Sequence, residues 1–394
     1  MHPGLRVSRR AFLGGAAASI GYAGLRPSPL HAEKHDLFPG LPFLQQEADE
    51  YDAMAKLAYN ENPYGPSDAV HAAMVKAFKY SMRYNYPDGG VESAIAQHHG
   101  VNEDHVLIGA GSGEILEVVG LTFLDSTKKV VGVEPSYGSV YSHASGIKAA
   151  AIKLPLLENY RQSIPAMIEA TNRHYREVGF VYLCNPNNPT GRTVTGQEVQ
   201  QLLDGIPPDV PVLIDEAYHH YVEDPEYATS IPYVLEGRPV IVARTFSKLF
   251  GMAAMRLGFA IATPEIIARM RPYSTGSVNA LVKWGAVAAL EDKEAQERVR
   301  RVTLALRKKT TRELESMGYP VIPSETNFFM VRTGRPVDSV RRAFRDRGIA
   351  VGRAFPPMLE HLRVSVGTEA EMSRFMTAFK EIFPVIETTG PTRG

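Results

Sequence analysis

Six short runs of apolar residues, separated by longer segments with helical spacing, constrain the fold of this chain most strongly. They lack the alternation of apolar and polar residues that marks a strand with one wet face, so each should be buried on both faces. Strands of this kind, alternating with helices, are typical of a mostly parallel sheet covered by helices on both sides. The sequence therefore predicts an α/β fold. The expected strands span residues 106–109, 129–133, 180–184, 210–214, 239–243 and 259–262.

A long charged segment with helical spacing, residues 291–317, follows this pattern. Beyond it, the apolar runs 327–331 and 362–366 are expected as strands, and residues 337–347 and 369–383 as helices. These elements predict a smaller α+β domain after the large one. The predicted organisation is a signal peptide at 1–32, an N-terminal arm at 33–62, a large domain at 63–290, a small domain at 291–387 and a tail at 388–394.

Charge and cysteine content exclude several classes of protein and site. The chain has 43 basic and 43 acidic residues, so it has no electrostatic footprint for nucleic acid or for a membrane surface. Cys184 is the single cysteine, which excludes an intrachain disulfide, and its apolar flank predicts a buried thiol. The adjacent histidine pairs at 98–99 and 219–220 predict no metal site, because sequence neighbours rarely point at one ion.

The N-terminus resembles a twin-arginine export signal. Arg9 and Arg10 precede a weakly apolar stretch, residues 14–25, that is too short and too rich in glycine and alanine to span a bilayer stably. Residues 30–32 offer a possible cleavage site. We therefore expect an exported, periplasmic protein without stable membrane anchoring. The alternative is a basic tail on a cytosolic enzyme.

Several groups suited to chemistry lie at or beyond the ends of the expected strands. Asp215 ends one strand, at the edge where parallel sheets bind ligands. Lys248 follows two hydroxyl residues, and Arg256 comes eight residues later. A glycine-rich turn at 109–114 opens a helix, whose free N–H groups can bind an anion. Taken singly, each signal has an ordinary interpretation. Asp215 could be a helix cap, Lys248 a surface charge and the turn at 109–114 an ordinary tight turn. Together they offer an amine, a carboxylate and an anion-binding cup.

Three motifs carry a resemblance to a known family. They are Asn-Pro-Asn-Asn-Pro-Thr-Gly at 185–191, Asp-Glu-Ala-Tyr at 215–218 and Thr-Phe-Ser-Lys at 245–248. Their order and spacing resemble the class I/II aminotransferases of fold type I, and within them the histidinol-phosphate aminotransferase branch. The resemblance spans residues 58–367. It implies pyridoxal 5′-phosphate (PLP) as cofactor and a homodimer with active sites at its interface.

The resemblance also implies a role for each matching residue. Lys248 would form a Schiff base with PLP, Asp215 would keep the pyridine nitrogen protonated, and Tyr218 would reach the phenolic oxygen. The other implied cofactor contacts are Asn188 at the phenolic oxygen, Tyr137 on the ring face, Ser112, Gly113, Thr245, Ser247 and Arg256 around the phosphate, and Tyr86 at the phosphate of the neighbouring subunit.

For the substrate, the resemblance implies that Arg363 holds the α-carboxylate and that Asn60 belongs to a loop over the site. The branch usually has a Val-Arg pair before its last arginine strand, where the arginine serves a substrate phosphate. Here the order is Val-Gly-Arg, so Arg353 is displaced by one residue. This departure puts a phosphate-bearing substrate in doubt, although Arg353 remains a candidate substrate contact.

The predicted activity is transfer of an amino group from an amino acid, or a histidinol-phosphate-like donor, to a 2-oxo acid. One alternative is a decarboxylase or a C–S lyase on the same fold, because the motifs select the cofactor more strongly than the bond that breaks. A second is a non-catalytic PLP-fold binding protein of the cell envelope.

Overall fold

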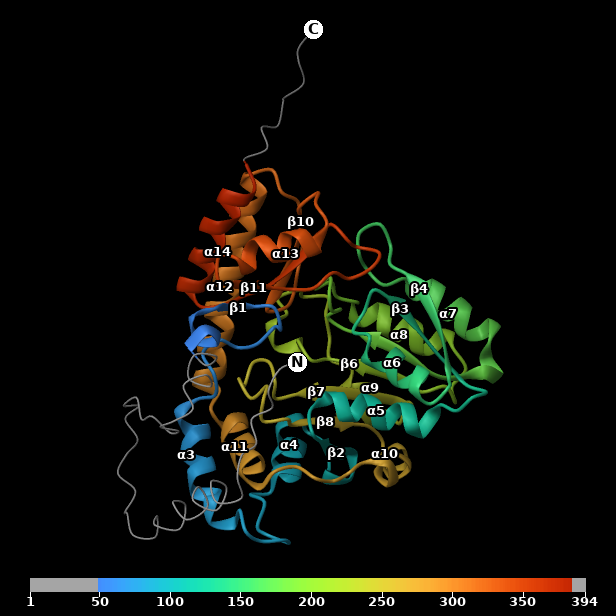
Figure 1. The fold of residues 1–394 in the computed structure, drawn as a ribbon. Coiled ribbons are helices and arrows are strands. Elements are labelled where there is room, and N and C mark those ends of the chain that lie inside the picture. The colour runs from blue at the N-terminus through green and yellow to red at the C-terminus, as the bar shows by residue number, and fades with distance from the viewer. Residues whose placement is uncertain (1–48, 385–394) are drawn as a thin grey trace, which may run out of the picture. The chain divides into compact units, whose positions relative to one another are not determined.

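The computed structural model describes residues 49–384. Its largest element is a seven-stranded sheet with the order β2-β8-β7-β6-β5-β3-β4, in which β8 runs antiparallel to β2 and β7 and all other pairs are parallel (Figure 1). The sheet confirms the α/β fold expected from the sequence. Its strands are β2 (Val106–Gly109), β3 (Lys129–Glu134), β4 (Ala150–Pro155), β5 (Val178–Cys184), β6 (Val212–Asp215), β7 (Val240–Thr245) and β8 (Gly258–Ile261).

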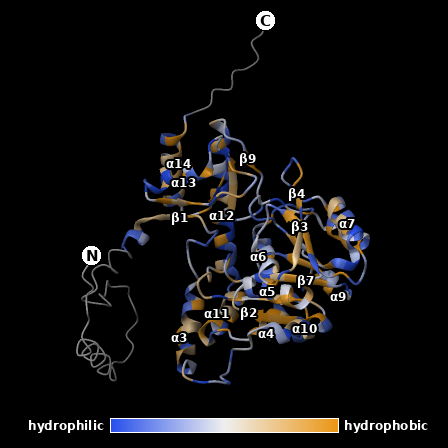
Figure 2. Ribbon diagram, turned by 45° about the vertical axis from the view of Figure 1, so that its right-hand side comes forward, coloured by the Kyte–Doolittle hydropathy of each residue, from blue (hydrophilic) through white to orange (hydrophobic). Residues whose placement is uncertain are grey.

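Helices cover both faces of this sheet, as the continuous apolar strands require. Alternate residues of β6 and β7 belong to two separate cores, one on each face. In Figure 2 the sheet is mostly hydrophobic, whereas α7 carries hydrophilic segments. One face packs against α5 (Ser112–Phe123), α6 (Ser139–Gly146) and α10 (Pro264–Met270). The other packs against α3 (Asp68–Ala77), α4 (Val91–His99), α7 (Ile164–Arg173), α8 (Gly196–Gly205), α9 (Ile231–Leu235) and α11 (Ala280–Glu291).

The C-terminal part forms a second core around a three-stranded antiparallel sheet with the order β12-β10-β9. A capping box begins α14, since Thr368 and Glu371 bond each other's backbone N–H groups. The elements are α12 (Lys293–Ser316), β9 (Val321–Ile322), β10 (Phe328–Arg332), α13 (Val337–Arg345), β11 (Ile349–Val351), β12 (His361–Ser365) and α14 (Glu369–Ile382). Short 3-10 helices lie at Phe78–Tyr80, Glu103–His105, Tyr175–Glu177, His219–Tyr221 and Arg271–Tyr273.

The segment expected as an irregular arm, residues 33–62, contributes a strand. β1 (Ala55–Leu57) pairs in parallel with β11, and both strands end next to each other. The residues after β1 and those after β11 are therefore delivered to one place, where they line the same cavity. From Ala53 onward the described residues belong to one compact unit, so the predicted boundary near residue 290 stays a prediction.

Besides β1, three strands were not predicted: β4, β9 and β11. β4 lies at the sheet edge and has several partly exposed side chains, so it lacks the apolar run that marks the inner strands. β9 and β11 have two and three residues, too few for a periodic signal. Within residues 49–384, no helix has both the length and the apolar character that crossing a membrane requires. The predicted export signal lies outside the described residues.

Candidate active site

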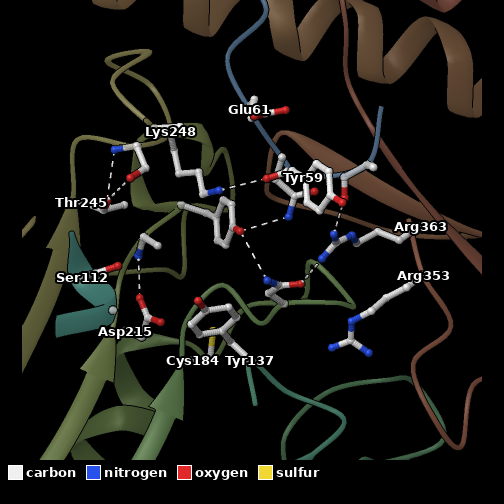
Figure 3. Close-up of a pocket in the computed structure, with 18 of the residues that line it drawn as sticks. Tyr59, Glu61, Ser112, Tyr137, Cys184, Asp215, Thr245, Lys248, Arg353 and Arg363 are labelled. Carbon is white, nitrogen blue, oxygen red and sulfur yellow. Dashed lines mark hydrogen bonds between the residues drawn. The ribbon is translucent and has the colours of Figure 1, made fainter. Parts of the chain in front are cut away.

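A cavity of about 440 Å³ opens at the carboxyl ends of β5, β6 and β7, whose last residues all line it (Figure 3). This edge is where parallel sheets place their ligands. Its lining includes most residues singled out from the sequence: Asn60, Ser112, Gly113, Tyr137, Asn188, Asp215, Tyr218, Thr245, Ser247, Lys248, Arg256, Arg353 and Arg363.

An anion-binding cup lies at one end of the cavity, at the N-terminus of α5. The Thr245 hydroxyl donates to Ser247 Oγ at 2.9 Å, and Arg256 Nη1 lies 3.4 Å from the same oxygen. Gly111 has a φ of 84°, and a Cβ there would lie 2.1 Å from Arg256 Nη2, so glycine is required. Arg256 itself has a φ of 59°, a left-handed conformation that is uncommon for a residue other than glycine and costs about 1–3 kcal/mol. Hydroxyls, a guanidinium and helix N–H groups together suit a phosphate.

Asp215 lies on the cavity floor and is almost fully buried. Tyr182 donates its hydroxyl proton to Oδ2 at 3.4 Å, and the Ala217 N–H donates to Oδ1 at 3.2 Å. Burial raises the pKa of Asp215 to about 6, against the lowering effect of these hydrogen bonds and of Lys248. A buried carboxylate with two weak donors is well placed to take a cation such as a protonated ring nitrogen.

The amine of Lys248 lies across the cavity from Asp215 (Figure 3). Nζ donates to the backbone oxygen of Tyr59 at 3.2 Å and lies 5.6 Å from the centroid of the Tyr218 ring. Burial, and then the nearby Arg363, lower the pKa of Lys248 to about 8, while Glu61 and Asp215 oppose the shift. The neutral amine is thus accessible near neutral pH, as a nucleophile or a proton carrier requires.

Tyr218 connects the cofactor residues with the N-terminal loop. Its hydroxyl accepts hydrogen bonds from Asn60 Nδ2 at 3.0 Å and from Asn188 Nδ2 at 3.4 Å. Burial raises the pKa of Tyr218, so the hydroxyl keeps its proton and can donate it in a hydrogen bond. Asn60 was expected only as part of a loop over the site, and the structure brings it into direct contact with this tyrosine.

Arg363 enters the cavity from β12 and is buried. Nη1 donates to Asn188 Oδ1 at 2.6 Å and Nη2 to the Ala58 oxygen at 2.7 Å, whereas the buried Nε has no partner. Burial lowers the pKa of Arg363 to about 10, so the group is still charged at neutral pH. An unpartnered Nε beside the second hydrogen of an Nη is the donor pair that a carboxylate takes in a bidentate contact.

Two further arginines line the cavity from the C-terminal part of the chain. Arg353 is exposed, and its guanidinium carbon lies 4.3 Å from the centroid of the Phe355 ring. Arg363 lies 4.8 Å from the same centroid, so Phe355 contacts both groups. Arg341 of α13 was missed from the sequence. Its helix shows which side is buried, but nothing in its spacing tells which cavity the opposite side faces.

Of the two aromatic residues expected at the cofactor, one lines the cavity and the other does not. Tyr137 lines the cavity and is 40% exposed, which leaves its ring available to stack on a cofactor ring. Tyr86 does not line the cavity, and its hydroxyl instead donates to the Val278 oxygen at 3.1 Å. A role for Tyr86 at a neighbouring subunit therefore stays a prediction.

The remaining lining residues were not assigned a role from the sequence, although Glu61, Ser136 and Ala217 lie next to residues that were. Cys184 is buried, as predicted, but its place on the cavity wall was not foreseen. Among the described residues, no group of three or more histidine, cysteine or acidic side chains could hold a metal ion. The other unforeseen lining residues are Ala58, Tyr59, Glu61, Ser136, Ala217, Ala253, Val351 and Phe355.

The donor set fits PLP. The anion cup, the buried carboxylate and the accessible amine lie around one cavity, in the roles that a phosphate, a pyridine nitrogen and an aldehyde require. When bound, PLP supplies a ring that withdraws electrons from a substrate carbon. Lys248 would hold the cofactor and carry the proton, and Asp215 would keep the ring nitrogen charged.

Comparisons with known proteins agree with this geometry. Residues 52–379 match the family model of aminotransferase class I and II. The chain is 36% identical over 354 residues to the histidinol-phosphate aminotransferase of Moorella thermoacetica, covering 87% of this chain and 89% of that protein. It is 32% identical over 352 residues to an aromatic amino acid aminotransferase of Cutibacterium acnes, covering 89% and 98%.

Solved structures of aminotransferases have a similar fold over most of their length. A putative histidinol-phosphate aminotransferase from Erwinia carotovora superposes with a TM-score of 0.80 at 29% identity, covering 84% of this chain and 97% of that one. The histidinol-phosphate aminotransferase of Sinorhizobium meliloti, solved with pyridoxal-5′-phosphate, has a TM-score of 0.78 at 25% identity, covering 88% and 98%.

Proposed function

The chain belongs to the class I and II aminotransferases and is a PLP-dependent aminotransferase of fold type I, and from this we propose that its amino donor carries a second anionic group in its side chain. The family, the cofactor and the type of reaction expected from the sequence are confirmed. The identity of the donor is the open part. It depends on which charged groups of the cavity remain once the cofactor and an α-carboxylate are bound.

Two arginines and one carboxylate, that of Glu61 near Lys248, remain, and the arginines carry the proposal. Arg341 and Arg353 line the same cavity as the cofactor residues, on the side from which Arg363 enters. Arg353 contacts the Ala354 oxygen and the Phe355 ring, and Arg341 has one acidic neighbour, the exposed Asp338 at 3.6 Å. Their charges are therefore little compensated by the chain itself. Guanidinium groups that keep unused donors beside a substrate site favour carboxylate or phosphate.

The space around these arginines supports the same conclusion. A second cavity of about 350 Å³ shares Ala58, Tyr59, Arg341 and Val351 with the first, so the two adjoin. Its wall includes residues of α13 that repeat at helical spacing and face one way: Asp338, Arg341, Arg342 and Arg345. A side chain that extends from the α-carbon toward this cavity would meet a mainly cationic surface.

The relatives name two kinds of donor. Most are histidinol-phosphate aminotransferases, which act on a phosphate ester, and one acts on aromatic amino acids. Histidinol phosphate carries its phosphate in place of an α-carboxylate, so that phosphate would bind Arg363. An acidic amino acid instead carries a second anionic group in its side chain, which Arg341 and Arg353 favour. An aromatic donor is the rival, since Tyr59, Tyr137 and Phe355 also line the cavity.

A donor panel tests the proposal. The PLP form is mixed with L-glutamate, L-aspartate, O-phosphoserine, histidinol phosphate, L-phenylalanine and L-alanine, and pyridoxamine phosphate formation is followed in single turnovers. L-glutamate, L-aspartate and O-phosphoserine carry the second anionic group, and they are expected to react with at least ~10-fold higher kcat/KM than histidinol phosphate, L-phenylalanine and L-alanine, the value of one charged hydrogen bond. Equal or faster reaction of phenylalanine would refute the anionic preference. Release of carbon dioxide instead of pyridoxamine phosphate would point to the decarboxylase alternative, and release of sulfide from L-cysteine, added to the panel for this purpose, would point to the lyase alternative.

We further propose that the protein is exported by the twin-arginine route. The supporting pattern is the Arg9–Arg10 pair before the weakly apolar segment, which lies outside the described residues. A cofactor enzyme suits a route that carries folded proteins, because PLP can be bound before export.

We also propose a homodimer in which Tyr86 reaches the partner's phosphate cup. In support, Tyr86 does not line the cavity of its own chain. Apolar side chains close to it in sequence are exposed, as a subunit interface requires: Val75, Phe78, Met82 and Tyr84. Sedimentation of the holoenzyme as a monomer at micromolar concentration would refute the dimer.

A further inference from the structure

Glu216 and Arg244 form a buried ion pair directly behind the cofactor residues. Glu216 is fully buried and Arg244 is 4% exposed. Arg244 donates to Glu216 Oε2 from Nη2 at 2.6 Å and from Nε at 3.1 Å. We propose that this pair positions Asp215 relative to the phosphate cup at Thr245, and that it is therefore part of the machinery that holds PLP in register. The inference rests on the cofactor roles predicted for these two residues.

The strands explain why this pair can act on the site without touching it. Glu216 follows Asp215 at the end of β6, and Arg244 precedes Thr245 at the end of β7. Successive side chains of a strand point to opposite faces. Asp215 and Thr245 therefore share the face that lines the cavity, and Glu216 and Arg244 share the opposite face.

The ladder of backbone hydrogen bonds between β6 and β7 ends next to the ion pair. The last ladder hydrogen bond runs from the Glu216 N–H to the Ala243 oxygen at 2.9 Å. Beyond it, β6 continues into the loop of Tyr218 and β7 into the loop of Lys248. The ion pair links the two strands one residue beyond this last backbone hydrogen bond. It therefore fixes the spacing between Asp215, which would hold the ring nitrogen, and Thr245, which would hold the phosphate.

The surroundings hold the pair in one geometry. Glu216 Oε1 accepts from the Ser230 N–H at 2.7 Å, and Oε2 accepts from the Thr229 hydroxyl at 3.0 Å. Arg244 Nη2 also donates to that hydroxyl at 2.7 Å. A carboxylate with four donors and a guanidinium with fixed acceptors have little freedom to rearrange.

A histidine also contacts Arg244 and completes the set of side chains around the ion pair. Arg244 Nη1 lies 3.3 Å from His99 Nδ1, and because arginine cannot accept, this nitrogen must be unprotonated. Burial, and then Arg244, lower the pKa of His99 to about 2, so the ring stays neutral at physiological pH. The Arg244 guanidinium is therefore the positively charged partner of Glu216, and it determines where the Glu216 carboxylate lies.

The rival explanation is that the pair only stabilises the large domain. Buried ion pairs contribute little net stability compared with apolar residues of similar volume, whereas breaking one partner is costly. A paired replacement, Glu216→Leu with Arg244→Met, therefore separates the two roles. It removes the charges and the fixed geometry together but leaves no isolated buried charge.

The test uses three readouts on the full-length enzyme: the thermal midpoint without cofactor, the PLP dissociation constant, and the visible circular dichroism of bound PLP. The paired variant should fold with a thermal midpoint lowered by no more than that of an Arg307→Met control, because it leaves the Ser230 N–H and the Thr229 hydroxyl without their acceptor but leaves no isolated buried charge. It should bind PLP at least ~10-fold more weakly and show altered dichroism, since a supporting shell sets such geometry. The single variant Glu216→Gln, which keeps the shape of the side chain, should show a smaller change of the same kind.

Arg307→Met provides the matched control. Arg307 is 5% exposed and lies 3.5 Å from Glu223, but it belongs to α12, which contributes no residue to the cavity lining. Its loss should lower the thermal midpoint and leave PLP affinity and dichroism unchanged. The proposal is wrong if the paired Glu216/Arg244 variant folds and holds PLP with wild-type affinity and dichroism. These readouts need no amino donor, so they are independent of the proposed substrate class.

Discussion

Arg363 donates a 2.6 Å hydrogen bond to Asn188 across 175 residues of sequence, and thereby joins the substrate end of the cavity to its cofactor end. The same Asn188 donates through Nδ2 to the Tyr218 hydroxyl. A carboxylate that binds Arg363 consequently acts on a network that already reaches the predicted position of the cofactor's phenolic oxygen. If the three side chains have their predicted roles, substrate binding and the electronic state of the ring would be connected through these hydrogen bonds.

Lys248 is expected to be the residue that holds PLP covalently. Its Nζ lies in the cavity with a lowered pKa, which favours the nucleophilic neutral amine. Borohydride reduction of the holoenzyme followed by peptide mapping should place the pyridoxyl group on Lys248. A label on another lysine would move the active site elsewhere.

The rate at which cofactor-free enzyme captures PLP should depend on pH with a midpoint near 8. The pKa of Lys248 is lowered to about 8, so the reactive neutral amine increases as pH rises through that value. Below the midpoint the rate should fall ~10-fold per pH unit, as expected for one titrating group. Stopped-flow absorbance between pH 6 and pH 9.5 measures this. A profile that is still rising tenfold per unit at the upper limit would show an unperturbed lysine.

Asp215→Asn should stabilise the cofactor-free protein and slow the enzyme. Burial raises the pKa of Asp215 to about 6 from 3.8, so the folded state binds a proton that the unfolded state has released between these values. Wild type therefore loses up to about 3 kcal/mol as pH rises from below 3.8 to above 6, since a shift of about 2 units is worth 1.36 kcal/mol per unit, and the variant does not. Urea unfolding at pH 4 and pH 7 should reveal a difference only at pH 7. The half-reaction should slow by ~100-fold, as when a preorganised charge is removed.

Arg363→Lys should weaken binding of the amino acid and of its oxo acid alike. Lysine keeps the charge but loses the planar pair of donors that a carboxylate takes from Nε and Nη. Both KM values should rise by ~10-fold or more, since a charged hydrogen bond contributes ~1.5–3 kcal/mol. The visible spectrum of bound PLP without substrate serves as the control and should not change. Loss of PLP with normal amino acid binding would make Arg363 a cofactor ligand instead.

Replacing both Arg9 and Arg10 by lysine should retain the protein in the cytoplasm, folded and yellow with bound PLP. The expectation follows from the requirement of the twin-arginine route for the arginine pair. Cell fractionation with immunodetection measures it, and a Lys34→Arg variant, which leaves the pair intact, is the control. Unchanged recovery of the double variant from the periplasm would exclude this route.

The inner strands and the residues at their ends could be read from the sequence because their signals are local. Burial of a strand on both faces leaves an uninterrupted apolar run, and the observed strands β2, β5 and β6 lie within two residues of the predicted ones. A polar residue at the end of such a run, such as Asp215, is placed at the binding edge by the sheet alone. The family resemblance then turned a set of single signals into one joint prediction.

The substrate side of the cavity was decided by tertiary structure. Arg341 is one of several arginines on an amphipathic helix, and its spacing shows only that it is not in the core. Its place at the cavity depends on how α13 and β11 pack, and the place of Asn60 depends on the pairing of β1 with β11, about 290 residues away. The ion pair of Glu216 and Arg244 likewise needs two strands in register. Periodicity is a property of neighbouring residues, whereas the meeting of distant segments depends on packing free energy summed over the whole chain, which no local pattern contains.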